Sequence, residues 1–261
     1  MDPILKLYSY INIEDSRNTY YKLSLFVIKN IKRLPELSIS QFAEESFVSK
    51  ATITRFIQFL EFESYAEFKS YFDYLNNSSK LSFLKLTESD VSNIQDAPLE
   101  FLHNYTQKIT ESIQDTVASM DVRAIDSLIH SVKSAKKVAF LGFSDSNTIA
   151  KDIQLGCLSI GKFIEIAESS QKFYDILERF DSNDLIVILS NYGNFFSVYH
   201  QLYNGLLSKK IPLILVTQNY STMDSFRFKQ TIYLTSKRQL NIGNYPMRIF
   251  SEYFVRRITF I

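Results

Sequence analysis

The chain has 261 residues, of which 46% are hydrophobic and 22% are charged, and its formal net charge is +1. This mixture is typical of a globular protein and excludes a disordered chain, which would carry fewer apolar residues or a larger charge imbalance. No apolar run approaches the about 20 residues that a membrane span needs, so no membrane partner is expected. A nearly neutral chain also lacks a broad basic field, so any contact with nucleic acid has to be local.

The single cysteine, Cys157, excludes an internal disulfide framework. Together with only three scattered histidines, it also argues against a metal site. The first ten residues, MDPILKLYSY, lack the basic and apolar segments of a secretory signal. We therefore expect a cytoplasmic protein without a metal or other cofactor. Because Cys157 lies between Leu155 and Leu158, we expect it to be a small buried hydrophobe and not a nucleophile.

Glycine is unevenly distributed, since all six glycines lie at position 142 or later. Strand-to-helix loops usually need glycine, whereas connections between helices can do without it. The first half of the chain is therefore expected to be helical, and the second half to mix strands with helices. The polar run 76–80 is the best candidate for a domain edge. We predict a first domain over 1–77, a linker over 78–106 whose polar stretch 87–96 is loose or frayed, and a second domain over 107–261.

Apolar residues at helical spacing predict four helices before residue 78. The first helix contains Leu23, Val27 and Ile31, and the second begins with Ser40, Phe42 and Ala43. The third runs from Ser49 to about Leu60, and the fourth contains Tyr65, Phe68 and Phe72. The first of these helices should end before Pro35, because the residue before a proline disfavours helical angles. Ser49 is expected to be the N-cap of the third.

Helical spacing continues from Pro98 to Ser134, and after Lys137 the period changes. Five short apolar runs then alternate with helix-length segments, at 138–142, 163–167, 185–190, 212–217 and 231–235. Continuous apolar strands separated by helices indicate a parallel sheet that is covered on both faces. The sequence therefore predicts an α/β protein overall, with an all-α N-terminal bundle and a C-terminal three-layer αβα sandwich around a five-stranded parallel sheet. A last helix, 245–261, ends in apolar residues that a partner subunit would cover.

Residues 39–60 fit two short helices that are joined by a tight turn. In the second of these helices the spacing of Ile53, Phe56 and Ile57 defines a buried face. The opposite face suits the major groove of DNA, because Arg can bind guanine, Gln can bind adenine, and Ser or Thr can reach phosphates or the thymine methyl group. The basic residue at the start of this helix would meet a phosphate. The candidate DNA-binding residues are Ser49, Lys50, Thr52, Thr54, Arg55 and Gln58.

Two observations do not favour DNA binding. Phe47 stands in the turn where a glycine is usual, and a bulky residue with positive φ would be strained. Residues 1–80 carry ten Lys and Arg and ten Asp and Glu, so the net charge of this segment gives DNA binding no support. A plain helical bundle, whose third helix has a polar surface, remains an alternative at this point.

The segment from Ser49 to Phe56, SKATITRF, with Tyr65 and Phe68-Lys69 after it, resembles the VS-x-AT-x-x-RF pattern of RpiR-type transcriptional regulators. Those proteins join an N-terminal helix-turn-helix to a C-terminal sugar isomerase (SIS) domain. Residues 141–162 are similar to the first strand, loop and helix of that domain, and the order of elements matches over nearly all of the chain. The resemblance implies a homodimer or homotetramer that binds a double-stranded DNA operator. It also implies a phosphosugar effector and control of genes for sugar or amino-sugar metabolism.

The sequence departs from this family at three connections. After the recognition helix, the family usually has the pattern LGF-x-G. The corresponding residues here, Leu60 to Ser64, contain neither glycine, so a helical or reshaped connection is expected. In the first SIS loop the family pattern G-x-G-x-S corresponds to residues 142–146, where Ser144 replaces the second glycine. In the second loop the family pattern S-x-S-G-x-T corresponds to residues 190–195, where Tyr192 replaces a serine and Phe195 replaces a threonine.

These changes predict a phosphosugar site that is partly degenerate. Two aromatic rings would shrink the pocket and remove hydrogen-bond donors, and Asp145 would place a negative charge close to a phosphate. Loops of this kind bind phosphate through hydroxyl groups and through backbone N–H groups at a helix N-terminus. The candidate ligand-binding residues are Ser144, Ser146, Asn147, Ser190, Asn191, Gly193 and Asn194.

Catalysis is not expected. Sugar isomerisation needs a general base with a tuned pKa, and the available carboxylates, Glu165 and Glu168, are predicted to be solvated residues at a strand end. No catalytic residue is therefore assigned. Two alternatives remain open: a sugar-phosphate binding or isomerising protein whose helical half only dimerises, and a scaffold in which both sites have decayed.

Overall fold

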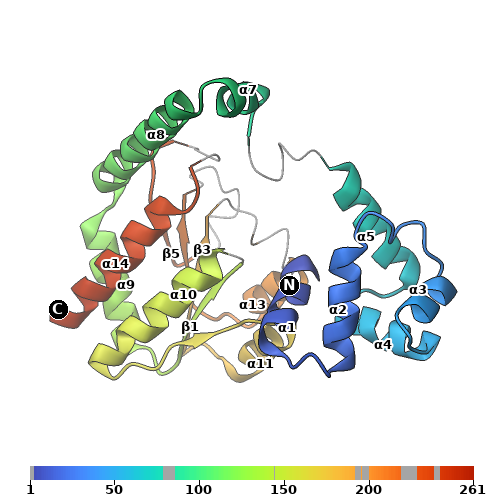
Figure 1. The fold of residues 1–261 in the computed structure, drawn as a ribbon. Helices are drawn as coiled ribbons and strands as arrows, with labels where there is room; N and C mark the ends of the chain where they lie inside the picture. The colour runs from blue at the N-terminus through green and yellow to red at the C-terminus, as the bar shows by residue number, and fades with distance from the viewer. Residues whose placement is uncertain are drawn as a thin grey trace. The chain divides into compact units, whose positions relative to one another are not determined.

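The computed structural model describes residues 3–78, 86–143, 145–191, 195, 200–218, 228–237 and 242–261. The chain forms two compact units, Met1–Thr87 and Glu88–Ile261. The first unit is helical, and the second combines helices with a sheet (Figure 1). Among the described residues no helix is long and apolar enough to cross a membrane.

The first unit consists of helices around an aromatic-rich core. They are α1 (Pro3–Ile13), α2 (Thr19–Lys29), α3 (Ile39–Glu45), α4 (Lys50–Phe59) and α5 (Tyr65–Asn77). The ring of Phe42 stacks on Phe26 at 5.1 Å and on Phe68 at 6.1 Å, so α2, α3 and α5 share one core. The four predicted helices are present, and α1 was not predicted. Ile31 lies beyond the end of α2, because Asn30 caps that helix with its backbone N–H on Phe26 and Val27.

Two helix ends in this unit use a left-handed backbone without glycine. Phe47 follows α3 with φ 56°, and Glu61 follows α4 with φ 72°. In each case the next N–H reaches back five residues, from Val48 to Ala43 at 3.0 Å and from Phe62 to Ile57 at 3.2 Å. This is the Schellman arrangement, in which glycine normally occupies the left-handed position. The connection after α4 is therefore a tight turn, and the expected helical or reshaped form was wrong. Its hydrogen bonds and the burial of Phe62 offset the strain.

The second unit begins with three helices, α7 (Glu88–Asp96), α8 (Pro98–Ser119) and α9 (Val122–Ser134). Residues 88–96 are therefore helical, although loose or frayed structure was expected there, and α8 confirms the helical pattern expected from Pro98. Acidic residues in the first turn of α7 suit the positive end of the helix dipole. Pro98 occupies the start of α8, where a proline needs no N–H partner.

The sheet has five parallel strands in the order β2-β1-β3-β4-β5. The strands are β1 (Val138–Gly142), β2 (Glu165–Ile166), β3 (Leu185–Ser190), β4 (Leu213–Thr217) and β5 (Gln230–Tyr233). This confirms the predicted five-stranded parallel sheet. Strand β2 is shorter than the apolar run 163–167, since it lies at the edge of the sheet and pairs with β1 alone.

Helices cover both faces of the sheet, which confirms the three-layer sandwich (Figure 1). On one face α9, α10 (Asp145–Gly156), the 3-10 helix η1 (Cys157–Ile160) and α14 (Tyr245–Phe260) form a core with Val187 and Leu189 of β3. On the other face α11 (Ser170–Arg179) and α13 (His200–Ser208) pack on Ile186 and Ile188. Alternate residues of β3 therefore enter opposite cores, as a strand that is buried on both faces requires.

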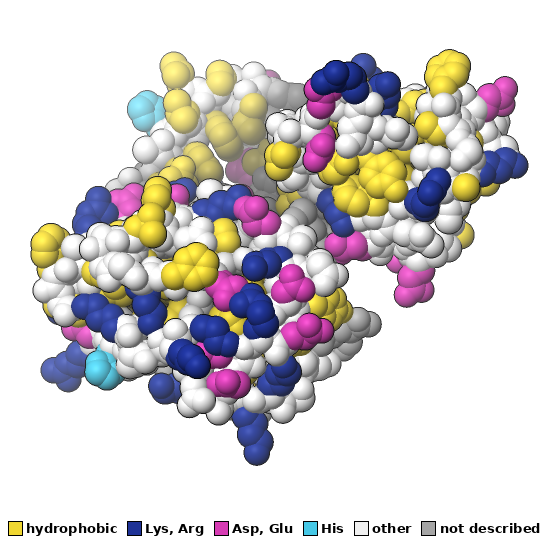
Figure 2. Space-filling model, turned by 90° about the horizontal axis from the view of Figure 1, so that it is seen from below, with side chains coloured by type: hydrophobic (Ala, Val, Ile, Leu, Met, Phe, Trp, Pro, Cys, Tyr) yellow, Lys and Arg dark blue, Asp and Glu magenta, His cyan; other side chains and the backbone are white. Residues whose placement is uncertain are grey.

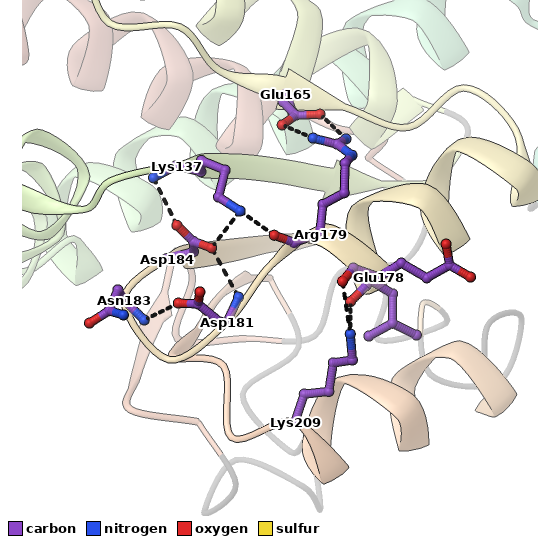
Figure 3. A network of polar contacts seen from close by, with 9 residues as sticks. Lys137, Glu165, Glu178, Arg179, Asp181, Asn183, Asp184 and Lys209 are labelled. Atoms are coloured by element: carbon purple, nitrogen blue, oxygen red, sulfur yellow. Dashed lines mark hydrogen bonds and ion pairs between the residues drawn. The ribbon is translucent and has the colours of Figure 1, made fainter.

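A network of polar contacts holds the amino ends of the strands (Figure 3). The Asp184 side chain has no exposed surface and pairs with Lys137 Nζ at 3.0 Å. Its carboxylate also accepts hydrogen bonds from the backbone N–H groups of Lys137, at 3.0 Å, and Asp181, at 2.9 Å. The Lys137 side chain donates as well to the carbonyl of Arg179 at the end of α11. One buried carboxylate thus joins the entries of β1 and β3 to the end of α11.

We predict that Asp184→Ala lowers the free energy of unfolding of the second unit by about 2–3 kcal/mol, because it leaves backbone donors unpaired and a lysine without its partner. Urea unfolding measures this change. Glu178→Ala is the control, since Glu178 is an exposed residue of the neighbouring helix, and we expect a change within about 0.5 kcal/mol. Equal stability of the two variants would contradict the role given to Asp184.

Candidate functional site

Helix α4 separates its apolar and polar residues onto opposite faces. Ile53 and Phe56 have no exposed surface, and Ile57 is 2% exposed. Arg55 and Gln58 are exposed on the other face. The division expected from the sequence is thus present in the structure, and the polar face is free to contact a partner.

The hydroxyl groups at the start of α4 are used within the helix itself. Ser49 is the N-cap, and its Oγ accepts a hydrogen bond from the backbone N–H of Thr52 at 3.1 Å. The Thr52 hydroxyl lies 2.9 Å from the same Oγ, and Thr54 donates to the carbonyl of Lys50 at 3.1 Å. Ser49 and Thr52 therefore act first as capping residues. Their predicted contacts with DNA remain predictions.

The longer polar side chains of α4 are different. Within the described part of the chain, the side chains of Lys50, Arg55 and Gln58 make no hydrogen bond or ion pair. All three are exposed. A helix that presents a guanidinium, an amide and an ammonium group without internal partners has donors available for base edges and phosphates.

The second candidate site lies at the carboxyl ends of β1 and β3. The chain leaves β1 for α10 on one face of the sheet, whereas α13, which follows β3, packs on the other face. In an open α/β sheet such a reversal leaves a crevice between the two strand ends, where ligands bind. Gly142 permits this geometry, because a Cβ there would lie 2.6 Å from the Ser146 carbonyl carbon.

The structure places several predicted ligand residues at these strand ends. Ser146, Ser190 and Asn191 are buried, with exposed fractions of 3%, 2% and 4%. Asn147 lies one residue further along α10, and among the described residues its buried Oδ1 has no hydrogen-bond partner. A buried acceptor without a donor is uncommon in a folded protein, so Asn147 has acceptor capacity left for a ligand. Ser144, Gly193 and Asn194 lie outside the described residues.

A buried polar layer supports these residues, and sequence reasoning missed it. Thr217 donates to the carbonyl of Ser190 at 2.7 Å, and Gln218 donates to Oδ1 of Asn191 at 3.1 Å. Thr235 in turn donates to the carbonyl of Gln218 at 2.9 Å. The available signal was the switch from apolar to polar residues at the end of each strand, in LILVTQ and IYLT.

Phe195 differs from its predicted place. It has no exposed surface, and its ring lies 6.0 Å from that of Phe173 in the core beneath the crevice. The ring therefore fills the core and does not narrow the pocket as expected, although the hydroxyl of a threonine is still lost. Tyr192 lies outside the described residues. Asp145 is exposed at the first turn of α10, where its negative charge would oppose the binding of a phosphate.

The two carboxylates that were considered for catalysis are both paired with cations. Arg179 binds Glu165 through two hydrogen bonds of 2.6 and 3.0 Å, and this pairing holds the pKa of Glu165 below its usual range. Glu168 pairs with Lys151. Glu165, Glu168 and Lys151 line a groove of about 610 Å³ beside β2. A carboxylate that is held ionised in this way is a weak general base.

Surface charge on the second unit is mixed in sign. Figure 2 shows Lys and Arg side chains interspersed with Asp and Glu over the face in view. The face in view therefore creates no single-sign field that would draw DNA to it. Cys157 is fully buried, as predicted, and burial raises the pKa of its thiol to about 11.

Residues 131–248 match the sequence model of the SIS domain. An uncharacterised HTH-type transcriptional regulator of Thermotoga maritima is 26% identical over 211 residues, which cover 79% of this chain and 72% of that protein. The structure of the Vibrio vulnificus NanR protein complexed with ManNAc-6P aligns with a TM-score of 0.52 and 16% identity, and covers 98% of this chain and 89% of that one. The sugar isomerase domain of an RpiR transcription factor from Sphaerobacter thermophilus aligns with a TM-score of 0.52 and 14% identity, over 62% and 89% of the two chains.

The second unit therefore contains a SIS domain, preceded in the chain by a helix-turn-helix. That combination is the organisation of RpiR-type transcriptional regulators, and relatives that align with most of this chain are HTH-type transcriptional regulators.

We predict that Ser49→Ala lowers the free energy of unfolding of the first unit by about 1 kcal/mol, because α4 loses its cap, whereas Ser49→Gly costs only a few tenths. Thermal unfolding of the two variants measures the difference. If Ser49→Ala were as stable as the unchanged protein, the hydrogen bond from Thr52 to Ser49 would have no part in holding α4.

Proposed function

We propose that α4 reads a double-stranded DNA operator and that a phosphorylated sugar bound to the SIS domain alters this binding. The chain would then control genes of sugar or amino-sugar metabolism. The observation that carries the proposal is the polar face of α4, on which Lys50, Arg55 and Gln58 are exposed without internal partners.

Each of these side chains suits a different part of DNA. Arg55 and Gln58 lie three residues apart and share one face of α4. A guanidinium binds guanine through two hydrogen bonds, and an amide binds adenine in the same way, so the pair can read adjacent bases in the major groove. Lys50 begins the helix and suits a phosphate at the groove edge. Thr54 keeps acceptor capacity for a nearby donor.

A second copy of the chain fits this function. Leu155 and Leu158 are exposed by 69% and 62%, and Phe260 and Ile261 by 87% and 50%. These residues belong to one region, because Ser159 in η1 lies within 3.0 Å of Thr259 in α14. A twofold pair of subunits that covers this apolar region would present two α4 helices, and the operator would then be palindromic.

The crevice at β1 and β3 is the proposed effector site. The NanR protein binds ManNAc-6P, and the residues that would contact such a ligand here are Ser146, Asn147, Ser190 and Asn191. The unpartnered Oδ1 of Asn147 can accept from a sugar hydroxyl. Backbone N–H groups at the start of α10 can bind phosphate, which Asp145 weakens. The ligand acts as a signal and not as a substrate, since the paired Glu165 does not suit proton abstraction.

The first prediction of this proposal separates base reading from phosphate contact. Arg55→Ala should weaken binding to the operator by about 1–3 kcal/mol and relax specificity at one base pair. Lys50→Ala should weaken binding to all duplexes alike. It should also reduce, by about one, the slope of the logarithm of the binding constant against the logarithm of salt concentration. Fluorescence titrations of operator and scrambled duplexes at several salt concentrations distinguish the two variants. Unchanged operator binding by Arg55→Ala would remove Arg55 from the reading face.

The second prediction concerns the effector. ManNAc-6P at about 100 times its dissociation constant should stabilise the protein by about 2.7 kcal/mol through linkage, so the melting temperature should rise. Asn147→Ala should lose most of this shift. Asn183→Ala, an exposed residue before β3, is the matched control and should keep it. An equal shift in both variants would place the ligand elsewhere, and no shift from any of a panel of sugar phosphates would contradict the phosphosugar assignment.

A further inference from the structure

Phe47 occupies a position that the stability of the fold does not explain. It lies in the turn between α3 and α4 with φ 56°, a left-handed backbone in which glycine is less strained than any residue with a Cβ. Its side chain is 95% exposed. A ring in water gains nothing from the hydrophobic effect, so the strained backbone is not offset by burial of this residue.

Other phenylalanines of the first unit show the contrast. Phe42, Phe56 and Phe68 have no exposed surface and make ring contacts with neighbouring aromatic residues. Within the described residues the ring of Phe47 makes no such contact. The tight turn itself depends on backbone hydrogen bonds, such as that from Val48 to Ala43, which glycine at position 47 would preserve.

The place of this ring in the unit suggests its use. Phe47 precedes the N-cap Ser49 by two residues, and two residues of extended chain span at most about 7 Å. The backbone of Phe47 therefore lies close to the first turn of α4, which begins at Lys50. Apolar side chains at the edge of the major groove contact thymine methyl groups, and deoxyribose offers a similar apolar surface.

We propose that Phe47 is a DNA contact, whose ring packs on the apolar surface of the duplex beside the first turn of α4. This inference rests on the proposed function, since it requires α4 to enter the groove. It adds an apolar contact to the polar set of Lys50, Arg55 and Gln58. It also accounts for a bulky residue at a position that favours glycine, because strain is retained at sites where function needs the side chain.

Glu61 provides a matched control within the same unit. It has the same kind of left-handed backbone, with φ 72°, and it follows the opposite end of α4. Its carboxylate pairs with Lys6 at 3.0 Å, so its side chain has a partner inside the unit. Glycine at either position relieves the same backbone strain, but only the change at position 47 removes the proposed contact.

The experiment compares Phe47→Gly with Glu61→Gly in the full chain. We expect Phe47→Gly to melt at or above the temperature of the unchanged protein and to bind the operator about tenfold more weakly, as the loss of a partly buried ring would cause. Glu61→Gly should bind the operator like the unchanged protein. The inference would be overturned if Phe47→Gly bound the operator as tightly as the unchanged protein while Arg55→Ala still bound it more weakly. A clearly lower melting temperature of Phe47→Gly would also overturn it, because the ring would then serve the fold.

Uracil in place of thymine, one position at a time, identifies the surface that the ring contacts. If a uracil substitution weakens operator binding by the unchanged protein but not by Phe47→Gly, the ring contacts the methyl group of that thymine. Insensitivity to every uracil, together with the tenfold loss in Phe47→Gly, assigns it to deoxyribose. If the unchanged protein selects no duplex at all, the proposed function itself fails, and that result differs from a failure at Phe47 alone.

Discussion

The burial of one face of α4 is the constraint on which the proposed reading of DNA depends. Ile53, Phe56 and Ile57 are held in the core of the first unit, so the helix cannot rotate without exposing them. The residues on its opposite face are thereby fixed in direction. Capping by Ser49 and the two tight turns set where the helix begins and ends. The result is a rigid polar face, which a groove-reading helix needs because base contacts require side chains at defined positions.

In the second unit, parallel pairing has the corresponding role. Strand β1 pairs with β2 on one side and β3 on the other, so the loops after β1 and β3 are neighbours although they are far apart in sequence. Asp184 and Lys137 hold the amino ends of these strands, and a buried layer through Thr217 and Gln218 holds their carboxyl ends. The crevice residues thus lie on a fixed frame. A ligand that reaches them would contact both halves of the sheet.

The sequence predicted the elements whose patterns are local. The apolar runs at 138–142 and 185–190 coincide with β1 and β3, because central strands are apolar throughout. Helix α1 was missed, since Leu7 is its one buried residue among those described and its pattern is weak. The turn at Glu61 was also missed, because propensity argues against a left-handed glutamate and only the burial of Phe62 and the hydrogen bonds of the turn favour it. The layer around Gln218 joins three strands through long-range contacts, which no local pattern records.

If α4 reads DNA as proposed, this chain selects a particular DNA sequence. The most direct measurement is the selection of genomic DNA fragments by the purified protein at near-physiological salt, with the Arg55→Ala protein treated alongside. We expect enrichment of a palindromic site that the variant no longer selects, with half-sites separated by whole turns of the duplex. Enrichment no greater than that of the variant, with and without sugar phosphate present, would contradict it.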